Sequence, residues 1–65
     1  MKIQFKNEEP YYGITVCNHT DMPIIPMKGD IIWLDGTKHE VVRREFDLNS
    51  STGESYVDVY VKDAL

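Results

Sequence analysis

The sequence predicts a small all-β protein: five antiparallel strands in a barrel or in two tightly packed sheets, with no substantial helix. Three observations predict this fold class. Apolar and polar residues alternate with period two in several segments, as they do in half-buried strands. Tight-turn and loop-type segments separate these stretches at short intervals. The 65 residues suffice for one hydrophobic core and not for two, so we expect a single domain over residues 1–65.

The alternation begins at the N-terminus. Residues 1–6 place Ile3 and Phe5 between polar neighbours, which predicts a strand with one buried face. Residues 7–10 contain Asn, Glu and Pro and predict a turn. Residues 11–17 resume the extended pattern with three apolar side chains on one side: Tyr12, Ile14 and Val16. These two strands are therefore expected to form a hairpin.

The middle of the chain carries the clearest turn signal. Residues 18–29 show neither period and predict a loop that covers apolar surface with Ile24, Ile25 and Met27. Residues 30–35 predict a strand that ends at Asp35-Gly36, a dipeptide that supplies the positive φ angles of a tight hairpin turn. Residues 38–47 form the return strand.

A change of apolar phase occurs inside that return strand. The apolar positions shift from His39 and Val41 to Val42 and Phe46, which indicates a bulge or a strong bend. A polar loop follows at 48–54. The last strand, residues 55–62, points its valines one way (Val57, Val59 and Val61) and its other side chains the opposite way (Tyr56, Asp58, Tyr60 and Lys62).

The segment 26–36 followed by Val41-Val42-Arg43 resembles the "Gly-Asp, strand, tight turn, strand" hairpin of SH3-like barrels and KOW-type modules. It is also similar to small uncharacterised phage and mobile-element proteins with that barrel. The resemblance covers residues 23–62 and implies an SH3-like barrel of bacterial or phage type. The Gly29-Asp30 turn lacks the basic neighbourhood of nucleic-acid-binding KOW modules, so no functional residue is carried over.

Charge and composition exclude some classes of function. Seven basic against eleven acidic residues give a net charge of −4, which disfavours general nucleic-acid binding. No apolar run approaches the length that spans a bilayer, so no membrane association is expected. The single cysteine, Cys17, excludes an internal disulfide, and no secretion signal is visible. These observations predict a cytoplasmic protein.

Residues suited to catalysis or metal binding are few. The soft metal ligands are Cys17, His19 and His39, fewer than the four of a structural zinc site. The aspartates are scattered among strand ends and turns, and the four glycines do not form a phosphate-binding loop. We therefore expect no enzymatic activity, no metal and no cofactor.

Two groups of residues are candidates for binding. Trp33 and Ile31 are out of phase with the apolar pair Ile32 and Leu34, which predicts that they face outward; the alternative is that the barrel or the preceding loop covers Trp33. The second group could stack a base, a proline or a ligand ring, and comprises Arg43, Arg44, Tyr56 and Tyr60. Its ordinary interpretation is a solvated sheet face with cross-strand ion pairs, such as arginine with Asp58.

The leading hypothesis is a non-enzymatic binding module that recognises a protein partner through an exposed strand edge or the Trp33 surface. Three alternatives remain open. The chain could be an acidic inhibitor of a nucleic-acid-binding enzyme, or a nucleic-acid or nucleotide binder that uses the arginines and tyrosines. It could also be a structural connector subunit of an assembly, in which case homo-oligomers are possible.

Overall fold

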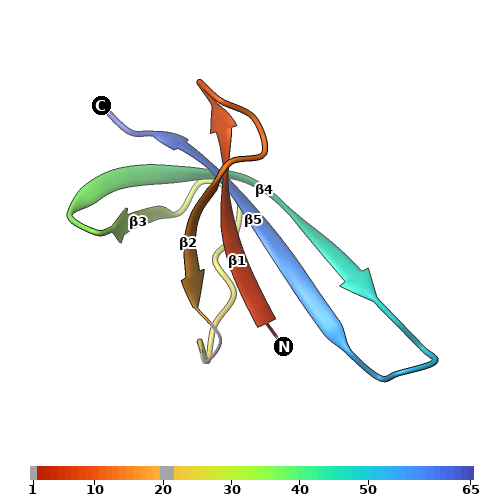
Figure 1. Cartoon of the computed structure of the whole chain (residues 1–65). Helices are drawn as coiled ribbons and strands as arrows, with labels where there is room; N and C mark the ends of the chain where they lie inside the picture. Colours follow the sequence, from red (N-terminus) through yellow and green to blue (C-terminus); the bar gives the residue numbers. More distant parts are fainter. Residues whose placement is uncertain (1, 20–21) are drawn as a thin grey trace.

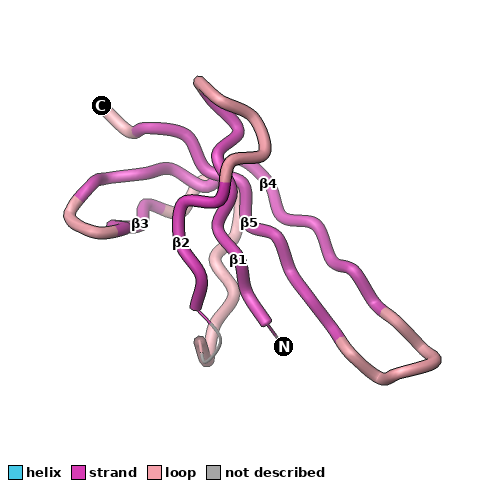
Figure 2. The backbone as a smooth tube through the Cα atoms, viewed as in Figure 1, coloured by secondary structure: helices cyan, strands magenta, loops and turns pink. Residues whose placement is uncertain are grey.

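The computed structural model describes residues 2–19 and 22–65, and within them it contains strands, turns and loops but no helix (Figure 2). One five-stranded sheet has the order β2-β1-β5-β4-β3. Its strands are β1 (Lys2–Glu9), β2 (Thr15–His19), β3 (Ile31–Leu34), β4 (Thr37–Leu48) and β5 (Ser55–Asp63). The sheet curls into half a barrel, as Figure 1 shows. The predicted all-β class and the number of strands are confirmed.

The prediction that all strands run antiparallel is wrong. β1 and β5 lie side by side and parallel, with Ile3 opposite Val57 and Phe5 opposite Val59. The other three neighbouring pairs, β1 with β2, β4 with β5 and β3 with β4, are antiparallel. Parallel neighbours need a long connection, and here the three intervening strands supply it. The first and last strands can therefore both lie in the middle of a mixed sheet.

The first hairpin forms, but its strands differ from those predicted. β1 continues to Glu9 and β2 begins only at Thr15. Two backbone hydrogen bonds close the connection: the Asn7 amide donates to the Ile14 carbonyl, and the Gly13 amide to the Asn7 carbonyl, both at 2.8 Å. Tyr12 and Ile14 consequently lie outside the strand and are exposed, whereas the alternation had placed them on its apolar side.

The second hairpin agrees with the sequence. Asp35 and Gly36 have φ angles of 50° and 82°, the left-handed conformations that a two-residue hairpin turn requires. β3 and β4 pair from Leu34 opposite Thr37 to Ile31 opposite Glu40. The predicted irregularity is also present, because the register of β4 against β5 shifts between Val41 and Arg43. That bulge at Val42 reverses which alternate residues of β4 face the core.

The core lies on the inner face of the curled sheet. Its buried residues come from four strands and are Ile3, Phe5, Leu34, Val41, Val57, Val59 and Val61. The segment that precedes β3 covers part of this face, because Ile25 packs against the core and Pro26 is buried. Ile24 and Met27 are exposed, so the prediction that they also cover apolar surface is wrong.

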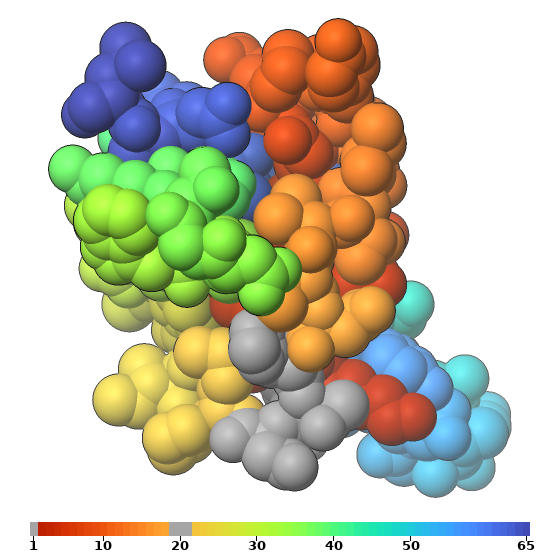
Figure 3. Space-filling view, turned by 60° about the vertical axis from the view of Figure 1, so that its left-hand side comes forward, coloured from red at the N-terminus to blue at the C-terminus, as the bar shows by residue number. Residues whose placement is uncertain are grey.

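The two edges of the sheet approach each other without pairing. β2 and β3 are the end strands, and hydrogen bonds connect each to one neighbour only. In Figure 3 the β3–β4 hairpin (green) lies against β2 (orange). The curled sheet thus has an open seam, and the outward-facing residues of β3 stand beside it.

Candidate functional site

The open edge of β3 carries the two apolar residues that the sequence predicts to face outward. Trp33 is 66% exposed and Ile31 is 48% exposed, whereas Leu34 is buried and Ile32 packs against the core. The predicted orientation of Trp33 and Ile31 is confirmed, and the alternative that the barrel or the loop covers Trp33 is wrong. An exposed tryptophan is typical of binding surfaces because a large apolar area gains most when a partner removes it from water.

Among the residues that the structure describes, the hydrogen-bonding pattern also leaves backbone amide and carbonyl groups without a neighbouring strand at this edge. The Val41 amide donates to the Asp30 carbonyl at 2.9 Å, so this carbonyl points towards β4, whereas the Asp30 amide donates to the Met27 carbonyl. Hydrogen-bonded and non-hydrogen-bonded pairs alternate along an antiparallel ladder. Ile31, opposite Glu40, and Trp33, opposite Lys38, are therefore non-hydrogen-bonded positions. Their amide and carbonyl groups point away from β4, towards the open edge.

A groove of about 390 Å³ runs along β3. Its lining is almost entirely apolar and consists of Phe5, Met22, Ile31, Ile32, Trp33 and Leu34. Phe5 belongs to β1 and is 1% exposed. The groove therefore lies between β3 and β1 and reaches the hydrophobic core. The combination of a free strand edge and an adjacent apolar groove suits an extended peptide segment with alternate apolar side chains.

A second cluster lies on the outer face of the sheet. The rings of Tyr12 and Tyr60 stack with centroids 5.5 Å apart and planes inclined by 13°. The Arg43 guanidinium lies 3.9 Å from the centroid of Tyr60 and donates a 3.0 Å hydrogen bond to the Tyr12 hydroxyl. Arg43 also forms ion pairs with Glu8, at 3.2 Å, and with Glu45. Its positive charge is therefore balanced by carboxylates of this chain, which leaves little attraction for a phosphate.

The tyrosine hydroxyls of this cluster titrate differently. A hydrogen bond from Tyr60, together with the one from Arg43, lowers the pKa of Tyr12 because both stabilise its phenolate. The same contact with Tyr12, and then burial, raises the pKa of Tyr60. Tyr60 is only 5% exposed, although it faces away from the valine core. The stacked ring of Tyr12 and the guanidinium of Arg43 cover it.

The structure separates the other two residues of the predicted aromatic and arginine group. Arg44 is paired with Val59 and so lies on the opposite face from Arg43, where its guanidinium is 5.3 Å from the centroid of Phe46. Tyr56 lies four residues before Tyr60 on β5, and the Lys2 ammonium is 5.7 Å from its ring centroid. Its hydroxyl donates to Glu54 at 2.8 Å. Only Arg43 and Tyr60 of the four predicted residues are brought together.

Sequence reasoning missed Tyr12 as a partner of Tyr60. Its period-two spacing with Ile14 and Val16 assigned it to a strand, and the spacing gives no information on a turn that folds back over β5. It also missed the ion pair of Asp58, which forms with Lys6 at 3.3 Å rather than with an arginine. Lys6 and Tyr60 are neighbours in the parallel ladder between β1 and β5, which the sequence did not predict.

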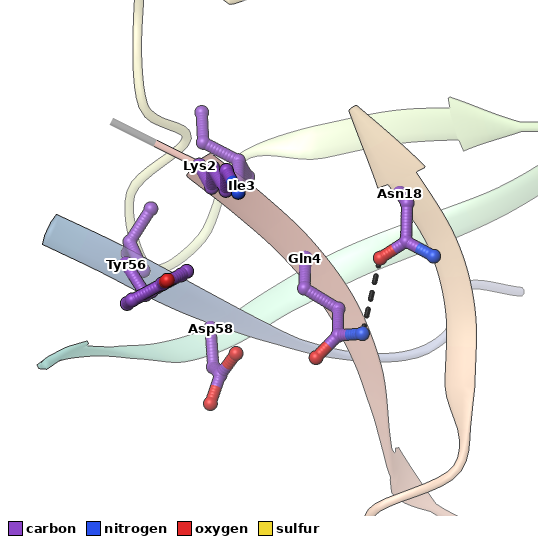
Figure 4. A pocket seen from close by; sticks show the side chains of 7 residues that line it. Lys2, Ile3, Gln4, Asn18, Tyr56 and Asp58 are labelled. Atoms are coloured by element: carbon purple, nitrogen blue, oxygen red, sulfur yellow. Dashed lines mark hydrogen bonds between the residues drawn. The ribbon is translucent and has the colours of Figure 1, made fainter. Parts of the chain in front are cut away.

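A pocket of about 310 Å³ with both polar and apolar lining residues lies at the junction of β2, β1 and β5 (Figure 4). The amide of Gln4 donates to the side-chain oxygen of Asn18 at 3.0 Å and ties the first two strands together. Asp58 and Tyr56 border the pocket from β5. The pocket offers polar groups for a ligand, but the charges of Asp58 and Lys6 already satisfy each other.

The described residues do not bring together a metal-binding group. Within residues 2–19 and 22–65, no three His, Cys, Asp or Glu residues lie close enough to hold a metal ion; the side chain of His19 falls outside the described part. His39 is 4% exposed, and its Nδ1 lies 2.9 Å from the Thr37 carbonyl, which can only accept. Nδ1 therefore carries a proton and donates it in a hydrogen bond to the Thr37 carbonyl, which stabilises the start of β4. Burial, followed by the charge of Asp35, raises the pKa of the Cys17 thiol.

Several of the described acidic side chains lie on the outer face of the sheet, among them Glu45 and Asp58, which face each other across β4 and β5. Glu8 and Glu45 pair with Arg43, and Asp58 pairs with Lys6. Asp35 lies in the β3–β4 turn and Asp63 at the end of β5, 3.6 Å from the His39 ring. Two basic side chains of the same chain, Arg43 and Lys6, offset the charge of the outer-face carboxylates that they contact.

No protein-family model, curated protein or solved structure matches this chain significantly. In the described part of the chain, no helix has the length and apolar character needed to cross a bilayer.

Proposed function

We propose that this chain is a non-enzymatic binding module that takes up an extended segment of a protein partner along the open edge of β3. The observation that carries the proposal is the juxtaposition of that edge with the exposed side chains of Trp33 and Ile31. The backbone groups of these two residues would add a strand to the sheet, and the adjacent groove would receive apolar side chains of the partner.

The other features fit a recognition role better than a catalytic one. The groove is apolar, so its affinity would come from buried area rather than from charge. We further propose an SH3-like half-open barrel, a bacterial or phage-type origin and a cytoplasmic location. The curled five-stranded sheet and the β3–β4 hairpin support the first of these, and the resemblance of residues 23–62 is the basis for the second.

The test is site-specific photo-crosslinking in the native host. A photoreactive phenylalanine analogue replaces Trp33 in one variant and Tyr11 in a control variant; Tyr11 is 68% exposed and lies outside the groove. We expect position 33 to form covalent adducts with one or a few proteins that position 11 does not form. The same adducts from both positions, or none from position 33, would contradict the proposal.

A second variant separates binding from folding. Trp33→Ala removes a side chain that is mostly exposed, so the melting temperature should change little while capture of the partner identified by crosslinking is lost. A partner that binds Trp33→Ala as tightly as the native chain would place the binding surface elsewhere.

A further inference from the structure

A second free edge runs along the C-terminal half of β4, away from the proposed β3 site. β3 pairs only with residues 37–40 of β4, whereas β5 pairs with β4 as far as Leu48. Within the described part of the chain, residues 42–48 therefore have a strand neighbour on one side only. In Figure 1 this part of β4 and the start of β5 project from the rest of the fold as a hairpin arm.

The backbone groups at this edge follow from one hydrogen bond at the base of the loop. The Asn49 amide donates to the Glu54 carbonyl at 3.0 Å, so this amide points towards the β5 side of the hairpin, and the Asn49 carbonyl accepts from Gly53. The ladder is regular from there to Arg43. By alternation, the amides and carbonyls that point to the open edge belong to Arg44, Phe46 and Leu48.

The side chains along this edge are two apolar residues and one arginine on the inner face and charged residues on the outer face. Phe46 is 47% exposed and Leu48 is 68% exposed, and both share the inner face with Arg44. Arg43, Glu45 and Asp47 share the outer face. An unprotected edge of seven residues with exposed apolar side chains is a template for pairing with another strand.

We propose that this edge pairs with the same edge of a second copy of the chain, antiparallel and centred on Glu45. In that register Arg43 faces Asp47 of the second copy, and Arg44 faces Phe46. Val42 faces Leu48. The two-fold axis repeats each contact, so the dimer gains two cation–π pairs and two aliphatic pairs, and it places each Asp47 beside an Arg43 that also pairs with Glu8 and Glu45 of its own chain. The segment 42–48, V-R-R-E-F-D-L, is complementary to its own reverse.

The one unfavourable contact in this register is offset within each chain. Glu45 faces Glu45 across the axis, but each Glu45 already forms an ion pair with Arg43 of its own strand. Centring on Arg44 places Arg43 opposite Glu45 twice and Arg44 opposite itself, whereas the registers displaced towards the β4–β5 loop are worse for charge. Centring on Phe46 places Glu45 opposite Asp47 twice, and centring on Asp47 places that residue opposite itself. In a parallel, in-register pair of strands, every charged residue would face the same residue of the second copy, so all these contacts would be between like charges.

The primary test is light scattering coupled to size-exclusion chromatography over a range of concentrations. We expect the native chain to reach twice its monomer mass of 7.6 kDa. Asp47→Arg replaces two contacts between opposite charges with two like-charge pairs and should raise the dimer Kd about tenfold or more. Glu9→Arg makes the same change of charge at the far end of β1 and should leave the Kd unchanged. A monomer at every concentration, or equal effects of the two variants, would overturn the proposal.

Disulfide trapping tests the register. In a Cys17→Ser background, Glu45→Cys places two thiols in a non-hydrogen-bonded pair, whose Cα atoms lie about 4.5 Å apart and suit a disulfide. On non-reducing gels we expect this variant to run as a covalent dimer and the matched Asp47→Cys variant to run as a monomer. Reducing gels, on which both variants should run as monomers, are the control. Preferential trapping through position 47 would overturn the Glu45-centred register, and trapping through neither position would overturn the dimer.

The dimer and the β3 site can fail independently. Trp33 lies on the other hairpin, so its fluorescence emission should stay the same across the concentrations at which the dimer forms. A concentration-dependent blue shift would mean that the copies meet through the Trp33 surface instead, which contradicts the proposed dimer edge.

Discussion

The ring of Tyr12 stacks on the ring of Tyr60, with the Arg43 guanidinium 3.9 Å from the centroid of the buried ring. Tyr60 faces the outer side of the sheet, where side chains are normally exposed to solvent. The turn that carries Tyr12 shields it, so a residue from the first connection of the chain protects a residue of the last strand.

We expect Tyr12→Ala to lower the melting temperature by a few degrees, because the stack is lost and Tyr60 is uncovered. Tyr11→Ala, at an adjacent exposed residue without this stacking, should change it far less. Circular dichroism melts of the two variants make the comparison. Equal shifts for both would mean that the stack contributes no stability.

A pH dependence follows from Tyr56. Its hydroxyl donates to Glu54, and this carboxylate raises the pKa of Tyr56 above its ordinary value of about 10. A raised folded-state pKa contributes stability that is complete below the unfolded pKa and is lost as the pH rises through the folded pKa. The stability advantage of the native chain over Tyr56→Phe should therefore shrink from about pH 10 upward. Urea unfolding of both proteins at pH 8 to 11.5 measures it; a constant difference would contradict the prediction.

The core is small enough for one truncation to remove most of its stability. Phe5 is 1% exposed, and Phe→Ala substitutions in cores cost about 3–5 kcal/mol. A core of this size supplies about the same amount, so Phe5→Ala should be largely unfolded at room temperature. Ile24→Ala removes an exposed side chain and should unfold at nearly the native urea concentration. Far-UV circular dichroism is the suitable probe because Trp33 is exposed in the native state.

The β3–β4 turn depends on Gly36. Its φ of 82° is in the left-handed region, and an added Cβ would meet no atom within 4 Å, so the cost of a side chain is confined to the backbone. Gly36→Ala should lower the free energy of unfolding by about 1–2 kcal/mol. Asp35→Asn, a residue type that tolerates φ > 0, should be nearly neutral. If Gly36→Ala leaves the urea midpoint unchanged, the turn relaxes at no cost.

The sequence predicted features that depend on neighbouring residues. The Asp35-Gly36 turn, the bulge at Val42 and the alternation of the last strand are all present. The outward position of Trp33 followed from the same alternation. Each of these depends on a local property, either the φ angle that a residue tolerates or the side of a strand that it faces.

The bulge also explains why the predicted aromatic and arginine group was only half right. The sequence indicated a phase change, but not its consequence for the two adjacent arginines. The extra residue at Val42 places Arg43 beside Tyr60 on the outer face and Arg44 beside Val59 on the inner face. A shift of one residue moves a side chain to the other side of the sheet.

The sequence by itself determined where most strands lie, where the chain turns and which side chains are apolar enough for the core. Only the tertiary structure decided that β1 lies parallel to β5, that Tyr12 covers Tyr60, and that β3 and the end of β4 keep open edges. Strands pair through backbone amides and carbonyls that every residue except proline carries alike. The choice of neighbour is therefore made by how distant segments share one core, which no local pattern records.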